Sequence, residues 1–202
     1  MSKPQYEFFH FEKYKRPEVS RIEAHHERTK EKYASNPDID PSRKHLNFHL
    51  IEPADRYNKI INQQVKEAGC RTRKDSVWML EAFFTASPEF FKRKSKQEIR
   101  EFFEECIKFL EKYQSRETFI SAVVHMDETT PHMHLSFVPL TEDKHLAAKT
   151  ITGTASPSAT IIWNRSASTT TTSTAISASR AISPASSPRK NGTGCRKSRQ
   201  AG

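Results

Sequence analysis

The sequence of 202 residues has few cysteines, no long apolar run and no acidic residue in its last quarter. Its cysteines, Cys70, Cys106 and Cys195, stand at distant, unpatterned positions. They form neither a disulfide framework nor a zinc cluster, and they indicate a reducing compartment. No apolar stretch approaches the roughly 20 residues that a membrane span needs, and residues 1–15 lack the apolar core of a secretory signal. We therefore expect a cytoplasmic protein with no membrane segment.

Composition and charge change near Lys149. All nine histidines precede this residue, whereas residues 150–202 carry seven Lys or Arg side chains and no Asp or Glu. Because 29 of these 53 residues are Ser, Thr or Ala, they cannot bury enough apolar surface to offset their loss of chain entropy. We expect a domain at 1–149 and a disordered, low-complexity basic tail at 150–202.

Two interpretations of this tail stay open. In the first, it is a basic extension that contacts nucleic acid weakly. In the second, a change of reading frame near Thr150 has replaced the native C-terminal part. We favour the second interpretation because the composition changes so abruptly.

Hydrophobic periodicity predicts a mixture of strands and helices. Strands are expected at 4–11, 44–52, 76–85, 118–126 and 132–140, and helices at 17–34, at 53–68 and twice within 88–113. The turn DETTP between the last two strands is short enough that they should pair antiparallel. These elements predict an α+β domain in which helices pack on one face of an antiparallel sheet.

Three histidines should converge at this last hairpin. Since residues i and i+2 of a strand point to the same face, His132 and His134 should lie side by side, and the hairpin brings His125 next to them. Three neutral imidazoles form an open site for a divalent metal. Asp127 and Glu128 in the turn are candidates to orient the imidazoles or to transfer a proton. The alternative is three unrelated histidines on half-exposed strands.

A second motif, His25-His26-Glu27-Arg28, suits phosphate chemistry. His25 and Arg28 share one face of a helix, so a phosphate attacked by the histidine would meet the arginine. Taken alone, the same residues fit a solvated, charged helix better.

These motifs resemble those of the MobV relaxases, also called Pre/Mob plasmid mobilisation or recombination proteins, which belong to the HUH (His-hydrophobic-His) nucleases. HMDETTPHMHLSFVP at residues 125–139 is similar to the family's third motif, SNPDIDPSRKHLNFHL at 35–50 to its second, and His25-His26-Glu27-Arg28 to its first. The motifs occur in the expected order over residues 5–149. Near Lys149 the resemblance stops, although the family would continue with further helices. It therefore implies a truncated HUH relaxase fold.

The resemblance implies a plasmid mobilisation relaxase, a metal-dependent enzyme that nicks one strand at an origin of transfer and stays attached to the 5′ phosphate. By resemblance, His125, His132 and His134 should hold Mn²⁺ or Mg²⁺, which polarises the scissile phosphate. Glu128 matches the family's acidic residue and should support that site. The partners implied are plasmid origin-of-transfer DNA and the conjugation coupling machinery.

The family is thought to use its first-motif histidine as the nucleophile, where most HUH enzymes use a tyrosine. By resemblance this role falls on His25, which would form a phosphoramidate, with Arg28 stabilising the phosphate charge. The adjacent His26 and a tyrosine remain alternatives. The candidate tyrosines, none of them in a matched motif, are Tyr6, Tyr14, Tyr33, Tyr57 and Tyr113. Phe48 stands where some relatives have a tyrosine, and it cannot act as a nucleophile.

Residues predicted to contact DNA lie in or near the second motif and in a later basic cluster. They are Arg43, Lys44, Asn47, Arg71, Arg73 and Lys74. An ordinary solvated face is the alternative for each cluster. Two other functions stay open for the whole chain. One is a non-catalytic DNA-binding relaxase fragment, and the other is a three-histidine metallo-phosphoesterase that acts on small phosphoesters.

Overall fold

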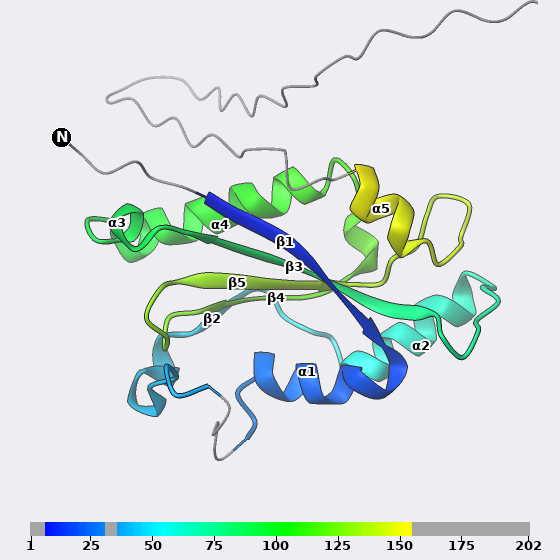
Figure 1. Ribbon diagram of the computed structural model, residues 1–202, viewed down its shortest axis with the longest axis horizontal. Helices are drawn as coiled ribbons and strands as arrows, with labels where there is room; N and C mark the ends of the chain where they lie inside the picture. Colours follow the sequence, from blue (N-terminus) through cyan, green and yellow to red (C-terminus); the bar gives the residue numbers. More distant parts are fainter. Residues whose placement is uncertain (1–6, 31–35, 155–202) are drawn as a thin grey trace, which may run out of the picture.

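The computed structural model describes residues 7–30 and 36–154 (Figure 1). The strands are β1 (Glu7–Lys15), β2 (Phe48–Ile51), β3 (Val77–Ala86), β4 (Phe119–His125) and β5 (His132–Phe137). The helices are α1 (Val19–His26), α2 (Tyr57–Glu67), α3 (Pro88–Phe91), α4 (Lys96–Leu110) and α5 (Ala148–Thr154), with short 3-10 helices η1 (Arg16–Glu18), η2 (Pro41–Leu46) and η3 (Arg116–Thr118). Each expected strand and helix corresponds to one of these elements, and α5 is an additional helix.

The five strands form one antiparallel sheet in the order β1-β3-β5-β4-β2. The hairpin predicted around DETTP is confirmed, since β4 and β5 pair with His125 opposite His132. On its other side β5 pairs with β3, which places Phe83 opposite His134 and Thr85 opposite His132. The strands that carry His125, His132 and His134 therefore lie in the interior of the sheet.

Helices cover both faces of this sheet. On one face α3, α4 and α5 enclose a core that includes Phe84, Phe103 and Phe137 (Figure 1). On the other, α1 and α2 pack through side chains such as Val19 and Ile61. The predicted α+β class with an antiparallel sheet is confirmed, but the placement of helices on one face only is corrected. The charged α1 contributes few buried apolar side chains, so its sequence pattern does not reveal that it packs.

The ends of two helices have clear local causes. Gly69 has a φ of 65° and follows α2, as expected for a glycine that stops a helix. α1 ends at His26 rather than at the predicted residue 34, because the chain turns at Arg28, whose φ is 49°. This left-handed conformation is unfavourable for arginine, and the contacts of its side chain, described below, offset the cost.

α5 crosses the predicted boundary at Lys149. Its residues Ala148 and Ile151 are 7% and 4% exposed and belong to the core on the α4 face. The core therefore extends to Ile151, and the rest of the predicted tail lies outside the described residues. The division of the chain into domain and tail stays a prediction. Within residues 7–30 and 36–154, no helix combines the length and the apolar character needed to cross a membrane.

Candidate active site

Three imidazoles meet on the α1 face of the sheet, where β4 ends and β5 begins. The ring centroid of His125 lies 5.3 Å from that of His132 and 4.8 Å from that of His134, and the last two are 5.0 Å apart. All three side chains are buried. The structure thus brings the predicted histidines together, while their role as metal ligands stays a prediction.

Each of these rings has one nitrogen near a protein oxygen. His125 Nε2 lies 2.9 Å from the carbonyl oxygen of His26, His132 Nδ1 lies 2.9 Å from that of Thr130, and His134 Nδ1 donates to Glu81. Within the described part of the chain, the other nitrogens of two rings, His125 Nδ1 and His134 Nε2, are buried without a hydrogen-bond partner. The second nitrogen of His132 lies 3.6 Å from Glu128 Oε1. Imidazoles fixed at one nitrogen and open at the other suit a metal ion.

The ligand atoms of this region form three overlapping groups, each with its atoms within 4.8 Å of one another. The groups are His25, His125 and His134; His26, Glu81 and His134; and His125, Glu128 and His132. The predicted trio is not itself one of these groups, because its members divide between the first and the third. These two groups share His125, so one ion near that ring would have ligands on both sides.

Burial keeps the central imidazoles neutral. It lowers the pKa of His134 to about 3, outweighing the contact with Glu81, and it lowers the pKa of His125 far below its ordinary value. Because a metal binds the neutral ring, both residues are ready to act as ligands at neutral pH without losing a proton.

Glu81 is a site residue that the sequence reasoning missed. Its carboxylate accepts from His134 and from the Tyr14 hydroxyl at 2.9 Å, and it lies 3.3 Å from His26 Nε2. Although burial raises its pKa, the contacts with His134 and His26 hold that pKa well below the ordinary value. The signal was a single acid within the apolar strand VWMLEAFFTA, since buried acids are rare without partners.

The two adjacent histidines of α1 have different surroundings. His26 is 2% exposed and lies against Glu81 and Ser136. His25 is partly exposed, and its ring centroid lies 5.5 Å from that of His134 and 5.7 Å from that of His125. Burial, with the nearby charge of Arg28, lowers the pKa of His25 to about 4. His25 is therefore the one of the pair that faces open space with an unprotonated ring.

The described tyrosines do not line this space. Tyr57 is buried, with its hydroxyl donating to Glu27 at 2.8 Å, and Tyr14 donates to Glu81. Tyr113 lies by the cavity at the other end of the sheet. Tyr6 and Tyr33 lie outside the described residues.

Arg28 lies beside His25, as expected, but most of its guanidinium binds the β4–β5 turn. Nε and Nη2 donate to Asp127 at 2.9 and 3.0 Å, and Nη2 also donates to Glu128 at 2.5 Å. Nη1 lies 3.3 Å from His25 Nδ1. One guanidinium nitrogen thus faces the histidine, while the others fix the two acids of the turn.

Three residues of the second motif hold the protein's own backbone. Arg43 donates to the carbonyl of Met126 at 2.6 Å, Lys44 donates to that of Arg28 at 2.8 Å, and Asn47 Oδ1 accepts from the amides of Met126 and Asp127 at 2.7 and 3.1 Å. These bonds fix the turn that carries Glu128 and the loop that follows α1. The predicted contact of Arg43, Lys44 and Asn47 with DNA stays a prediction.

The later basic cluster is not brought to the histidines. Arg71, Arg73 and Lys74 are exposed on the loop between α2 and β3 (Figure 1). This loop precedes the first residue of β3, whereas Phe83 and Thr85, which pair with the histidine strand, lie near its end. Any contact of the cluster with DNA would therefore be remote from the site.

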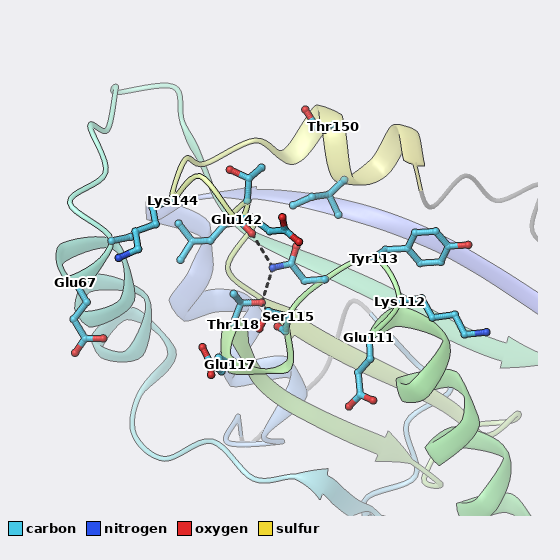
Figure 2. A pocket seen from close by; sticks show the side chains of 15 residues that line it. Glu67, Glu111, Lys112, Tyr113, Ser115, Glu117, Thr118, Glu142, Lys144 and Thr150 are labelled. Carbon is cyan, nitrogen blue, oxygen red and sulfur yellow. Dashed lines mark hydrogen bonds between the residues drawn. The ribbon is translucent and has the colours of Figure 1, made fainter.

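A cleft of about 610 Å³ opens beside the histidines, lined by His25, Glu128, His132 and His134 and by an apolar side that includes Phe8 and Phe83. A larger cavity of about 910 Å³ lies elsewhere (Figure 2). Its lining includes four glutamates and Gln114, which donates to Thr118 and to the carbonyl of Leu140. Because no histidine lines this larger cavity, we assign the candidate site to the cleft.

Comparisons with known proteins agree on one family. The sequence profile described as "Plasmid recombination enzyme" (Mob_Pre) matches residues 3–163. The chain is 36% identical over 147 residues to a plasmid recombination enzyme of Bacillus thuringiensis, covering 72% of this chain and 33% of that protein. It is 33% identical over 136 residues to a type 3 plasmid recombination enzyme of Staphylococcus aureus, covering 65% and 33%. The chain thus spans about a third of the length of these relatives.

The fold is similar to a solved relaxase structure. The MobM relaxase domain, in a Mn-bound crystal structure with origin-of-transfer DNA of plasmid pMV158, aligns with a TM-score of 0.67 and 34% identity. The alignment covers 72% of this chain and 76% of that domain. The HUH relaxase fold expected from the motifs is therefore confirmed.

Proposed function

The chain belongs to the Mob_Pre family of plasmid recombination enzymes, and we therefore propose that it is a DNA relaxase, a strand-specific endonuclease that acts by transesterification. The proposed substrate is plasmid origin-of-transfer DNA, single-stranded or supercoiled, and the nicking supports plasmid mobilisation and recombination. One arrangement carries the proposal. His25 lines the cleft, and close to it the buried ring nitrogens His125 Nδ1 and His134 Nε2 have no hydrogen-bond partner among the described residues.

A divalent cation, Mn²⁺ or Mg²⁺, is the proposed cofactor, and Mn is the metal of the MobM structures. His125, His132 and His134 would hold it, with Glu128 beside them. When bound, such an ion withdraws charge from a phosphate oxygen. The chain's own contribution is a set of rings held in place by Glu81 and by two backbone carbonyls.

In the proposed reaction, a ring nitrogen of His25 attacks the scissile phosphorus, so that an N–P bond forms and the P–O3′ bond breaks. The leaving 3′ oxygen takes up a proton, and the imidazole releases the proton of its second nitrogen. The products are a free 3′ hydroxyl and DNA joined to His25 through its 5′ phosphate. The lowered pKa of His25 leaves a lone pair available at neutral pH, and Arg28, whose Nη1 lies 3.3 Å from His25 Nδ1, would stabilise phosphate charge.

We also propose that the chain acts in the cytoplasm, where its plasmid substrate would be, and that the conjugation coupling machinery receives the covalent DNA adduct. Arg43, Lys44, Asn47, Arg71, Arg73 and Lys74 are retained as proposed DNA contacts. Arg43 and Asn47 would also fix the turn at Glu128, and Lys44 would fix the loop that follows α1.

The test is a nicking assay on supercoiled plasmid that carries the pMV158 origin, with Mn²⁺ present. We expect relaxed plasmid with protein attached to the 5′ end. His25→Ala should slow the reaction on the order of 10³-fold or more, whereas the control His145→Ala, at an exposed histidine outside the cleft, should retain it. Mild acid should release the DNA, because a phosphoramidate is acid-labile and a phosphotyrosine ester is not.

Other outcomes identify the alternatives. Nicking that survives in His25→Ala would assign the nucleophile to His26 or to a tyrosine. Binding of DNA without nicking would indicate a non-catalytic relaxase fragment. Hydrolysis of small phosphoesters, unaffected by the presence of an origin, would indicate a metallo-phosphoesterase.

A further inference from the structure

The apolar side of the cleft carries an aromatic surface next to the histidines. Phe8 is 54% exposed, and among the described residues no other large hydrophobic side chain is exposed in this way. On neighbouring strands Phe8 is opposite Thr85 and His10 is opposite Phe83, so these four side chains share the site face of the sheet. Phe8 and Phe83 both line the cleft.

Rings continue from this surface to the predicted metal ligands. The Phe83 ring stacks on that of His132, with centroids 5.2 Å apart and planes at 28°. On its other side the ring centroid of His10 lies 4.9 Å away, with planes at 31°. Phe83 also meets His134 edge-on at 5.4 Å. The aromatic surface is therefore continuous with the place where a phosphate would react.

We propose that the exposed ring of Phe8, beside Phe83, is a stacking platform for a nucleobase of single-stranded DNA, next to the phosphate that would react at His25. This proposal rests on the proposed relaxase function and adds a subsite to it. A nucleotide matches the cleft because its phosphate would lie beside His25 and His132, which line the cleft, while the apolar face of its base would meet Phe8. Bases stack on aromatic side chains without regard to sequence, so the platform holds the strand in place rather than reading the origin.

Phe8 is the residue that tests the platform. Its side chain is exposed, so its loss leaves the core intact, whereas Phe83 supports His132 and its loss would disturb the site. The probes are two fluorescein-labelled 12-mers of equal charge, oligothymidylate and a wholly abasic strand, and the measurement is fluorescence anisotropy with Mn²⁺ at low salt. Phe8→Ala should weaken binding of oligothymidylate about 10-fold and leave binding of the abasic strand unchanged. Phe8→Trp should restore the affinity.

The outcomes separate this proposal from the proposed relaxase function. His25→Ala should abolish nicking and keep the full effect of Phe8→Ala on binding. Equal losses on the two strands, or no loss on oligothymidylate, would overturn the platform while leaving the relaxase function standing. If the wild-type chain bound neither strand, both proposals would be wrong.

Discussion

At the scale of single residues, the site depends on buried charges that have partners. Glu81 is 4% exposed, yet it contacts both His26 and His134. A carboxylate that accepts from one nitrogen of a metal-binding imidazole fixes the ring and raises its basicity at the other nitrogen. We therefore infer that Glu81 is a positioning residue, which sets the orientation of His134 without contacting substrate.

Replacing Glu81 with glutamine should weaken metal binding. Glu81→Gln keeps the size of the side chain but removes the charge, so we expect the affinity for Mn²⁺ to fall about 10- to 100-fold. Calorimetric titration of the purified chain with Mn²⁺ measures this change. Glu117→Gln, at an exposed glutamate remote from the cleft, is the control and should bind like the wild type. An unchanged affinity in Glu81→Gln would remove Glu81 from the site.

Arg28 illustrates the same dependence in the backbone. Its left-handed conformation is unfavourable by itself, but it directs the guanidinium to Asp127, which is fully buried. A two-pronged bond of this kind requires the planar fork of arginine and is not reproduced by lysine. The first and third motifs are therefore joined by one buried ion pair, across 99 residues of sequence.

At the scale of elements, one network ties α1 to β2 and α2. Glu27, directly after α1, accepts from Tyr57 of α2 at 2.8 Å and lies 3.1 Å from His49 of β2. The hydrogen bond with Glu27 raises the pKa of His49. For Glu27, burial raises the pKa, but the bonds from His49 and Tyr57 outweigh it and the net shift is downward.

These shifts predict a stability that depends on pH. The raised pKa of His49 stabilises the fold fully below its ordinary value of 6.5, and the effect is lost as pH rises through the raised value. The lowered pKa of Glu27 stabilises above its ordinary 4.5, and that effect is lost as pH falls through the lowered value. The free energy of unfolding of the wild type should therefore be about 1 kcal/mol larger than that of His49→Gln between pH 4.5 and 6.5. At higher pH the difference should be smaller.

Urea unfolding of both chains across this range of pH measures the difference. The control is His145→Gln, at an exposed histidine, which should give a difference that is small and flat with pH. If the difference in free energy of unfolding between wild type and His49→Gln became larger above pH 7, the assignment of the network would be wrong.

Elements with strong periodicity were predictable, and those defined by distant contacts were not. The alternation of apolar residues around His125 and His134 fixed two strands and their pairing, because a one-residue shift would bury the wrong face. The end of α1 depends on an ion pair between Arg28 and Asp127, which local sequence does not encode. The sequence of α5, AKTITGT, contains several weak helix formers. The helix forms because Ile151 packs into the core.

At the scale of the whole molecule, the same contrast holds for the site. The first and third motifs gave His25, His125, His132 and His134 as candidates from sequence, because each residue follows a local spacing. Glu81 was not predicted, because its role depends on contacts with residues of α1 and β5 that are distant in the sequence. The hydrogen bonds of the second motif with the backbone of Met126 and Asp127 were not predicted for the same reason. Local patterns therefore located the residues that we propose to react, whereas tertiary contacts position them.

The extent of the folding unit leads to a prediction about truncation. Among the described residues, Ile151 is the last one of the buried core, and it lies beyond the compositional change at Lys149. A chain of residues 1–154 keeps all of this core, so it should unfold at the same urea concentration as the full chain. A chain of residues 1–146 loses Ala148 and Ile151, and we expect it to be less stable by about 3 kcal/mol.

Urea denaturation of the three chains, followed by tryptophan fluorescence, measures this comparison, because Trp78 is buried in the core that α1 and α2 cover. The control is the 1–154 chain with Lys149→Ala and Thr150→Ala. Both side chains are exposed, so this variant loses surface groups of α5 and keeps its core residues, and it should be as stable as 1–154. If 1–154 were as unstable as 1–146, residues beyond 154 would belong to the folding unit. Equal stability of 1–154 and the full chain would place every stabilising core contact before residue 155.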